Sequence, residues 1–273
     1  MKQSEESFSP LLTHELLSQL ATDMDDETVT AIILHGSYAR GDAIAPYSDI
    51  DLVRLLKETP ERRQSKRFIW YKGYLLNLSS RPLSLYREWL TVPQEALFRI
   101  ATIREAHILL DKEGTFATFQ QEALNWRWDP LQEAANAYAS QSMVELSETI
   151  LRMLGALQLQ KTVMLTQRIL HHVLPTVTRA LLIQRGILIR GNHAVQQVQE
   201  ALGLDSLWTR LYMQAAGVAL HGEATTIEAR GIAALRLYEE TVRLLQPALL
   251  PEHWETIKGL LHVVNQRLNE PIT

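Results

Sequence analysis

The chain has 273 residues, of which 46% are hydrophobic, a formal net charge of −4 and no cysteine. It is long enough to bury one large core or two modest ones, and the lack of cysteine excludes disulfide bonds and thiolate chemistry. The mixed charges do not form the clustered basic surface that sequence-independent nucleic-acid binding needs, and no apolar run approaches the ~20 residues that span a bilayer. We therefore expect a cytoplasmic protein with no membrane and no nucleic-acid partner.

The first half of the chain mixes strand and helix patterns. Ser9-Pro10 is a typical helix start, and Lys72-Gly73 is a typical turn between two strands. We expect a small mixed sheet flanked by helices over residues 1–128. Its predicted elements are a helix over 10–21, strands over 28–35 and 49–53, a charged connector or short helix over 57–67, strands over 68–71 and 74–79, helices over 82–90 and 93–106, a strand over 107–111 and a helix over 114–126.

The second half is helical throughout. Asp129-Pro130 is a typical cap and first turn, and Thr225-Thr226-Ile227-Glu228 resembles a capping box. We expect an all-α bundle over residues 129–273, which makes the whole chain an α+β protein. The predicted helices cover 130–157 with a break near Ala139-Ser140, then 160–185, 193–202, 206–220, 226–245 and 251–268.

The most informative stretch joins an apolar run to a tight turn. Residues 32–35 are Ile-Ile-Leu-His and lead directly into Gly36-Ser37, the pattern of a buried strand that ends at a turn. Gly36 has no side chain to hold an anion away, and Ser37 adds a hydroxyl donor. The N–H groups of a short following helix would face the same anion. The stretch therefore predicts a phosphate-binding turn.

Two acids follow on the next predicted strand. Asp49 and Asp51 are two residues apart in an alternating polar and apolar segment, so their carboxylates leave one face of the strand at a spacing of roughly 6.6 Å. Carboxylate pairs bind Mg²⁺, which completes its coordination shell with water and substrate phosphate. The sequence thus places a metal site beside a phosphate site, as phosphate-transfer chemistry requires.

These residues also carry a resemblance. Gly36-Ser37, Arg40 and Ser48-Asp49-Ile50-Asp51 resemble the signature of the DNA polymerase beta-like nucleotidyltransferase superfamily, and the strings Gly-Ser-Tyr-Ala-Arg and Pro-Tyr-Ser-Asp-Ile-Asp are most similar to kanamycin nucleotidyltransferase. The resemblance implies a catalytic domain that binds ATP or another nucleoside triphosphate through Gly36, Ser37, Arg40 and Ser48, with Asp49 and Asp51 on Mg²⁺. It also implies a homodimer and a small hydroxyl-bearing acceptor of the aminoglycoside class.

One position departs from this family's pattern. Kanamycin nucleotidyltransferase and its relatives carry a third acidic residue on the strand that corresponds to residues 74–79, and this sequence has Asn77 there. An amide cannot act as a base and is a weaker metal ligand than a carboxylate. Asn77 is expected either to contact a metal-bound water or substrate hydroxyl, or to be an ordinary polar residue at the end of a strand.

The general base is expected on the first long helix of the bundle. The residues that bind metal are poor proton acceptors, so a further acid is needed, and Glu145 and Glu148 share a helix side with Arg152. The resemblance favours Glu148 as base and Arg152 as a triphosphate ligand, because they match the family's four-residue spacing. Glu145 remains the alternative base or a substrate-binding residue.

Three functions are compatible with these residues. The first is a Mg²⁺-dependent nucleotidyltransferase that moves AMP to a small molecule, such as an antibiotic-resistance enzyme that modifies an aminoglycoside. The second is a protein-adenylylating transferase of the toxin–antitoxin kind, and the third is a non-catalytic nucleotide-binding module. The intact pair Asp49 and Asp51 favours catalysis, whereas Asn77 keeps the third alternative open.

Overall fold

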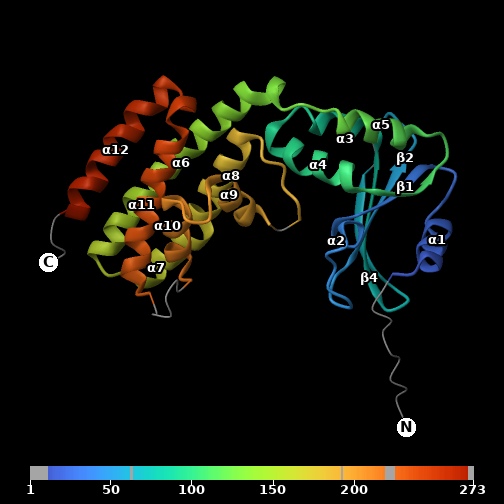
Figure 1. Ribbon diagram of the computed structural model, residues 1–273, viewed down its shortest axis with the longest axis horizontal. Helices are drawn as coiled ribbons and strands as arrows, with labels where there is room; N and C mark the ends of the chain where they lie inside the picture. The colour runs from blue at the N-terminus through green and yellow to red at the C-terminus, as the bar shows by residue number, and fades with distance from the viewer. Residues whose placement is uncertain (1–11, 62–63, 192, 219–224, 270–273) are drawn as a thin grey trace, which may run out of the picture. The chain divides into compact units, whose positions relative to one another are not determined.

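The computed structural model describes residues 12–61, 64–191, 193–218 and 225–269 (Figure 1). The chain divides into two compact units, Met1–Arg127 and Trp128–Thr273. The first contains a mixed sheet with flanking helices and the second is helical, which confirms the predicted α+β class. Among the described helices, none combines the length and apolar character needed to cross a bilayer.

The first unit is organised around one five-stranded sheet with the order β3-β4-β2-β1-β5. All neighbouring strands are antiparallel except β2 and β4, which run parallel. The predicted strand after residue 106 joins the sheet at the edge beside β1. The strands are β1 (Val29–His35), β2 (Ile50–Leu56), β3 (Ser65–Tyr71), β4 (Tyr74–Pro82) and β5 (His107–Asp111).

Different helices cover the two faces of the sheet (Figure 1). Leu34, Leu52 and Leu76 are buried on one face, where Leu20 of the first helix completes their core. Because side chains alternate along a strand, residues one position away, such as Val53, lie on the opposite face, against which the later helices pack. The helices are α1 (His14–Asp23), α2 (Gly36–Arg40), α3 (Leu83–Trp89), α4 (Pro93–Glu105) and α5 (Thr115–Leu124).

Two details of the first unit differ from the sequence prediction. The expected helix start at Ser9-Pro10 lies outside the described residues, and α1 is instead capped by Thr13, whose hydroxyl accepts a hydrogen bond from the Leu16 amide at 3.2 Å. Within the described part of residues 57–67 there is no helix, and β3 already begins at Ser65. The turn at Lys72-Gly73 is confirmed, with φ values of 47° and 85° that suit a two-residue hairpin.

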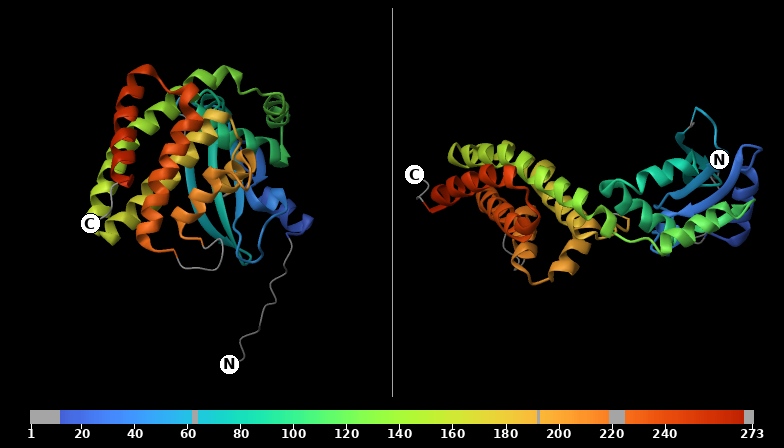
Figure 2. Two further views of the ribbon diagram at one scale, coloured as in Figure 1. Left: turned by 60° about the vertical axis from the view of Figure 1, so that its left-hand side comes forward. Right: turned by 90° about the horizontal axis from the view of Figure 1, so that it is seen from above.

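The second unit is a bundle of helices (Figure 2). Helix α11 packs against several of the others, and about half of its residues are buried. Its helix ends follow ordinary capping rules, since Ser206 and Thr226 each accept a hydrogen bond from an amide three residues later. The helices are α6 (Gln132–Gln158), α7 (Thr162–Arg168), α8 (Leu174–Arg185), α9 (Ala194–Leu202), α10 (Leu207–Ala216), α11 (Ile227–Leu245) and α12 (Pro251–Asn269), with short 3₁₀ or π segments at Asp129–Leu131, Ile169–Val173 and Gln246–Ala248.

Two helix boundaries of the bundle were predicted wrongly. The expected break near Ala139-Ser140 does not occur, because the buried Ser140 hydroxyl bonds to the His253 ring at 2.9 Å and to the Leu250 amide at 2.8 Å. The single helix expected over 160–185 is interrupted by the π-helical turn Ile169–Val173. Pro175 explains the interruption, since proline donates no backbone hydrogen bond and its ring crowds the carbonyl four residues earlier.

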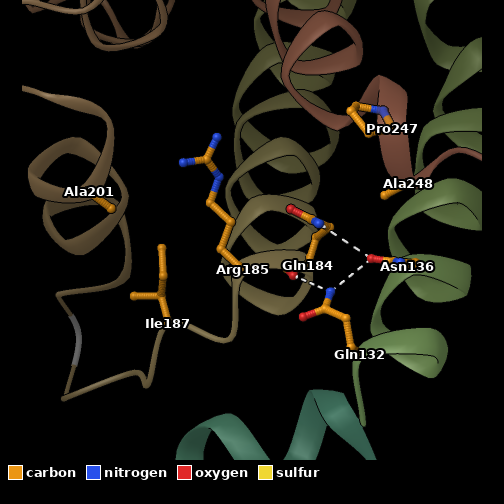
Figure 3. A pocket seen from close by; sticks show the side chains of 8 residues that line it. All are labelled: Gln132, Asn136, Gln184, Arg185, Ile187, Ala201, Pro247 and Ala248. Carbon is orange, nitrogen blue, oxygen red and sulfur yellow. Dashed lines mark hydrogen bonds between the residues drawn. The ribbon is translucent and has the colours of Figure 1, made fainter. Parts of the chain in front are cut away.

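A group of three amide side chains ties α6 to α8 (Figure 3). The Gln132 amide nitrogen donates to Asn136 Oδ1 at 2.9 Å and to the Gln184 backbone oxygen at 2.8 Å, and the Gln184 side chain donates to Asn136 at 3.3 Å. These amides line a cavity of about 610 Å³ in the bundle. Their mutual hydrogen bonds satisfy polar groups where the two helices meet, which fixes the packing of α8 on α6.

Candidate active site

One row of side chains crosses the sheet at the end of β1. His35 pairs with Asp51 on β2, and Asp51 pairs with Asn77 on β4. Directly paired residues on neighbouring strands point to the same side of a sheet, so these three side chains share one face. The Asn77 amide donates a hydrogen bond to Asp51 Oδ1 at 2.7 Å. Asp49 was expected on the same strand as Asp51, but it lies one residue before β2, so only Asp51 of the acid pair is within the strand.

The turn after β1 lies directly against this row. Gly36 begins α2 with a φ of +75°, and a Cβ atom at this position would lie only 2.1 Å from Asp51 Oδ2. We expected Gly36 to let a phosphate approach the backbone. The structure adds a second reason for glycine, because any side chain here would collide with the carboxylate of Asp51.

The other residues predicted to bind nucleotide have partners of their own. Ser37 is the second residue of α2, and its carbonyl oxygen accepts a hydrogen bond from the Asp42 amide at 3.0 Å. Arg40 pairs with the side chain of Asp42 at 3.1 Å, and the Ser48 hydroxyl accepts a hydrogen bond from the Ile44 amide at 2.8 Å. Ser48 therefore shapes the loop that leads to Asp49.

The surroundings of Asp51 destabilise the ionised form of its carboxyl group. Burial and the neighbouring carboxylate of Asp49 raise the pKa of Asp51 to about 6, although Asn77, Lys66 and Arg40 act to lower it. A carboxylate with a raised pKa beside a second acid gains more from a bound cation than an ordinary surface carboxylate does. This arrangement favours a metal ion at the acid pair.

Four basic residues act on the same row, and of these the sequence analysis singled out only Arg40. Burial lowers the pKa of His35 to about 4, and Arg81, Arg99, Arg40 and Lys66 lower it further through their positive charges. His35 is therefore neutral at physiological pH. A site with this much positive charge beside the acid pair suits an anionic ligand.

Two of these basic residues, Arg81 on β4 and Arg99 on α4, share one aromatic partner. Their guanidinium carbons lie 5.0 and 4.1 Å from the ring centre of Trp89. The Nε atoms of both arginines are buried and have no hydrogen-bond partner among the described residues. No sequence motif marks these residues, because they come from a strand end and a helix that only the fold brings together.

Mg²⁺ fits the residues present. Among the described residues, no group of three or more His, Cys, Asp or Glu side chains could enclose a metal ion. Mg²⁺ does not need one, since it is usually held by one or two carboxylates together with water and substrate phosphates. Asp49 and Asp51 would supply the carboxylates, and Asn77 Oδ1 is a buried acceptor with no partner in the described part of the chain. Its free acceptor is compatible with a metal-bound water or a substrate hydroxyl.

We expect Asn77→Asp to make the stability of the protein depend on Mg²⁺. The new carboxylate would lie within hydrogen-bond distance of Asp51, whose partner Asn77 Nδ2 is now 2.7 Å away, and like charges this close raise the pKa of Asp51 further. Thermal unfolding should show a loss of about 1 kcal/mol without Mg²⁺ and recovery with it. Asn125→Asp, an exposed residue at the end of α5, is the matched control and should show no Mg²⁺ dependence. Equal behaviour of the two variants would contradict a metal site.

The candidate bases lie on α6 in the second unit. Glu148 and Arg152 form an ion pair one helical turn apart, with 68% and 59% of their side chains exposed. Glu145 accepts a hydrogen bond from Gln141 at 2.7 Å and lines a cavity of about 420 Å³ together with Tyr138 and other residues of the bundle. The structure thus places Glu145 in a concave surface, and Glu148 is not among the residues that line it.

Part of the first unit is similar to a known family of domains. Residues 17–109 match the family described as "Nucleotidyltransferase domain", which supports nucleotidyl transfer as the general chemistry and a nucleoside triphosphate as substrate. A solved structure similar to the whole chain is that of a nucleotidyltransferase-like protein from Exiguobacterium sibiricum 255-15. It is 16% identical, with a TM-score of 0.49, and the match covers 95% of this chain and 80% of that one. No curated protein matches the sequence.

Proposed function

We propose that this protein transfers a nucleoside monophosphate, AMP in the first instance, from a nucleoside triphosphate to a hydroxyl of a small molecule and releases pyrophosphate. The observation that carries the proposal is the contact between the Gly36 turn and Asp51 within the region that matches a nucleotidyltransferase domain. The turn and the acid touch, so one triphosphate can contact both. A non-catalytic nucleotide-binding module would not need the acid pair.

The chain's own residues then have distinct tasks. Asp49 and Asp51 would hold Mg²⁺, which when bound supplies positive charge to the reacting phosphates. Ser37 and Arg40 bind the triphosphate, with Arg152 assisting. The acceptor oxygen forms a bond to the α-phosphorus, the bond from that phosphorus to the bridging oxygen of pyrophosphate breaks, and the hydroxyl proton passes to a glutamate. Positioning and charge provide most of the acceleration.

Glu148 is the proposed proton acceptor, in its own site or in that of a partner subunit of a homodimer. Glu148→Gln should lower kcat by about 10²- to 10⁴-fold, the usual contribution of a general base, with little change in the KM for ATP. Glu145→Gln is the matched comparison one turn earlier on α6 and should mainly raise the KM of the acceptor. A larger kcat loss in Glu145→Gln would reverse the two roles.

The decisive experiment uses ATP labelled at the α-phosphate with Mg²⁺. Separate panels of hydroxyl-bearing small molecules, among them aminoglycosides, and of proteins are incubated with the wild type and with Asp51→Asn. Label that appears on a small molecule only with the wild type supports the proposal. Label on a polypeptide would instead favour the protein-adenylylating alternative, and binding of ATP without any transfer would favour the non-catalytic module.

A further inference from the structure

The edge strand β3 exposes two large aromatic side chains. Trp70 is 76% exposed and Phe68 is 57% exposed, although both lie within a regular strand. Their neighbours Ile69 and Tyr71 point the other way and pack against the core that contains Leu76. Large aromatic side chains two residues apart on one face of a strand remain in contact with water here, which is unfavourable for their apolar surface. They are typical of a surface that stacks on a ring.

The strand register places this aromatic pair beside the acid row. Phe68 pairs with Asn77, which pairs with Asp51, so the three residues share one row across β3, β4 and β2. Two strand spacings of ~4.8 Å separate Phe68 from Asp51, a distance of about 10 Å. Trp70 lies on the same face two residues further along β3. A single ring compound lying over Asn77 can therefore touch both aromatic side chains and bring a hydroxyl to the acids.

A positive charge completes the strand's exposed face. Lys66 is exposed two residues before Phe68, and its amine lies 5.1 Å from the centre of that ring. Its charge also reaches the acid row, since it acts on both Asp51 and His35. Lys66, Phe68 and Trp70, which we call the β3 platform, thus combine one cation with two ring-stacking surfaces. This combination binds a ring that carries an anionic group and disfavours a polycation.

The line along which the hydroxyl attacks the phosphorus indicates that the β3 platform faces the acceptor and not the triphosphate. In phosphoryl-type transfer the attacking and leaving oxygens lie roughly in line on opposite sides of the phosphorus. With the triphosphate at the Gly36 turn on the β1 side of Asp51, the attacking hydroxyl enters from the β4 and β3 side. The β3 platform lies on that side.

We propose that the β3 platform is the acceptor site, and that the acceptor is a nucleotide-like molecule whose base stacks on Trp70 and Phe68 and whose phosphate pairs with Lys66. This inference rests on the proposed function and narrows its acceptor class. A ribose hydroxyl of the acceptor attacks the α-phosphorus of ATP, a new phosphate ester bond forms, pyrophosphate leaves, and the hydroxyl proton goes to the glutamate base.

Equilibrium binding by calorimetry tests the platform independently of turnover. The probes are uridine 5′-monophosphate (UMP), uridine, ribose 5-phosphate and kanamycin A, each measured with a non-hydrolysable ATP analogue bound. UMP should bind tightest. Trp70→Ala should weaken UMP binding about tenfold and leave ribose 5-phosphate unchanged, because only UMP has a base to stack. Lys66→Ala should weaken UMP and ribose 5-phosphate but not uridine.

Two matched controls come from the same sheet. Arg67→Ala removes an exposed charge next to Lys66 on the other side of β3, and Ile108→Ala removes an exposed apolar side chain from the opposite edge strand β5. Neither should change UMP binding. Competition between UMP and the ATP analogue, or tightest binding of kanamycin A, would overturn the proposal.

Binding and transfer can fail separately. If UMP binding depends on Trp70 and Lys66 but no labelled AMP is transferred to any probe, the platform stands and the proposed reaction fails. If transfer occurs and Trp70→Ala leaves UMP binding and the KM of the acceptor unchanged, the reaction stands and the platform fails.

Discussion

Gly36→Ala should reduce nucleotidyl transfer by about a hundredfold or more. A Cβ atom at this position would lie 2.1 Å from Asp51 Oδ2 and 3.0 Å from its Cγ, so the turn or the carboxylate must move. The displacement separates the two halves of the candidate site, and misplacement of reacting groups by about 1 Å can cost this much in rate. Initial rates with labelled ATP, together with ATP binding by calorimetry, measure the effect.

Gly41→Ala is the control that distinguishes the contact with Asp51 from backbone strain alone. Gly41 has a φ of +80°, close to the +75° of Gly36, but a Cβ atom there would meet nothing within 4 Å. Both variants carry the cost of a left-handed alanine, about 1 kcal/mol. Gly41→Ala should therefore lower the melting temperature while keeping most of the activity. Equal activity loss in the two variants would show that backbone strain, rather than the contact with Asp51, explains the requirement for glycine.

Asp51→Asn should abolish transfer and at the same time stabilise the fold above pH 6. The activity loss, about a thousandfold or more, reflects removal of a proposed Mg²⁺ ligand. The stability gain follows from the raised pKa of Asp51, about 6 against an ordinary value of 3.8. A raised pKa in the folded state means that the stability contributed by this group is fully present below pH 3.8 and is lost as the pH rises through 6.

The pH dependence of unfolding tests whether Asp51→Asn stabilises the protein at higher pH. Melting temperatures of the wild type and Asp51→Asn should coincide near pH 3.8, and that of the variant should become the higher as the pH rises to about 7. The corresponding difference in the free energy of unfolding is about 1 kcal/mol once the partial exposure of Asp51 is allowed for. Addition of Mg²⁺ should stabilise only the wild type, and its effect should weaken about tenfold in affinity per pH unit below 6. A variant less stable than the wild type at pH 8 without metal would contradict the electrostatic account.

The local features of the site were predictable from sequence because they depend on short segments. An apolar run that ends in Gly36-Ser37 can hardly be anything other than a strand that meets a turn, and two acids at a spacing of two share a strand face. The structure has β1 ending at His35 and β2 beginning at Ile50, beside Asp49. The strand, turn and helix context that the motif requires is therefore present.

The remaining features depend on pairing between distant segments. Asn77 could be aligned with the third acidic position of the resembling family, but its hydrogen bond to Asp51 follows from the parallel register of β2 and β4, which the sequence does not specify. The exposure of Trp70 likewise requires knowing that β3 is an edge strand, since the same residues in a central strand would be core. The interruption of 160–185 could have been inferred from Pro175 alone.

The parallel pairing of β2 with β4 also shapes how this unit folds. β3 and β4 are joined by the two-residue turn at Lys72-Gly73, so that hairpin can close early through local contacts. Asp51 and Asn77 lie 26 positions apart in the chain, and closing such a loop is slower than closing the hairpin because it costs more conformational entropy. The carboxylate is then desolvated in the step that joins the β3–β4 hairpin to β2. We expect the β3–β4 hairpin to form before the contact between Asp51 and Asn77.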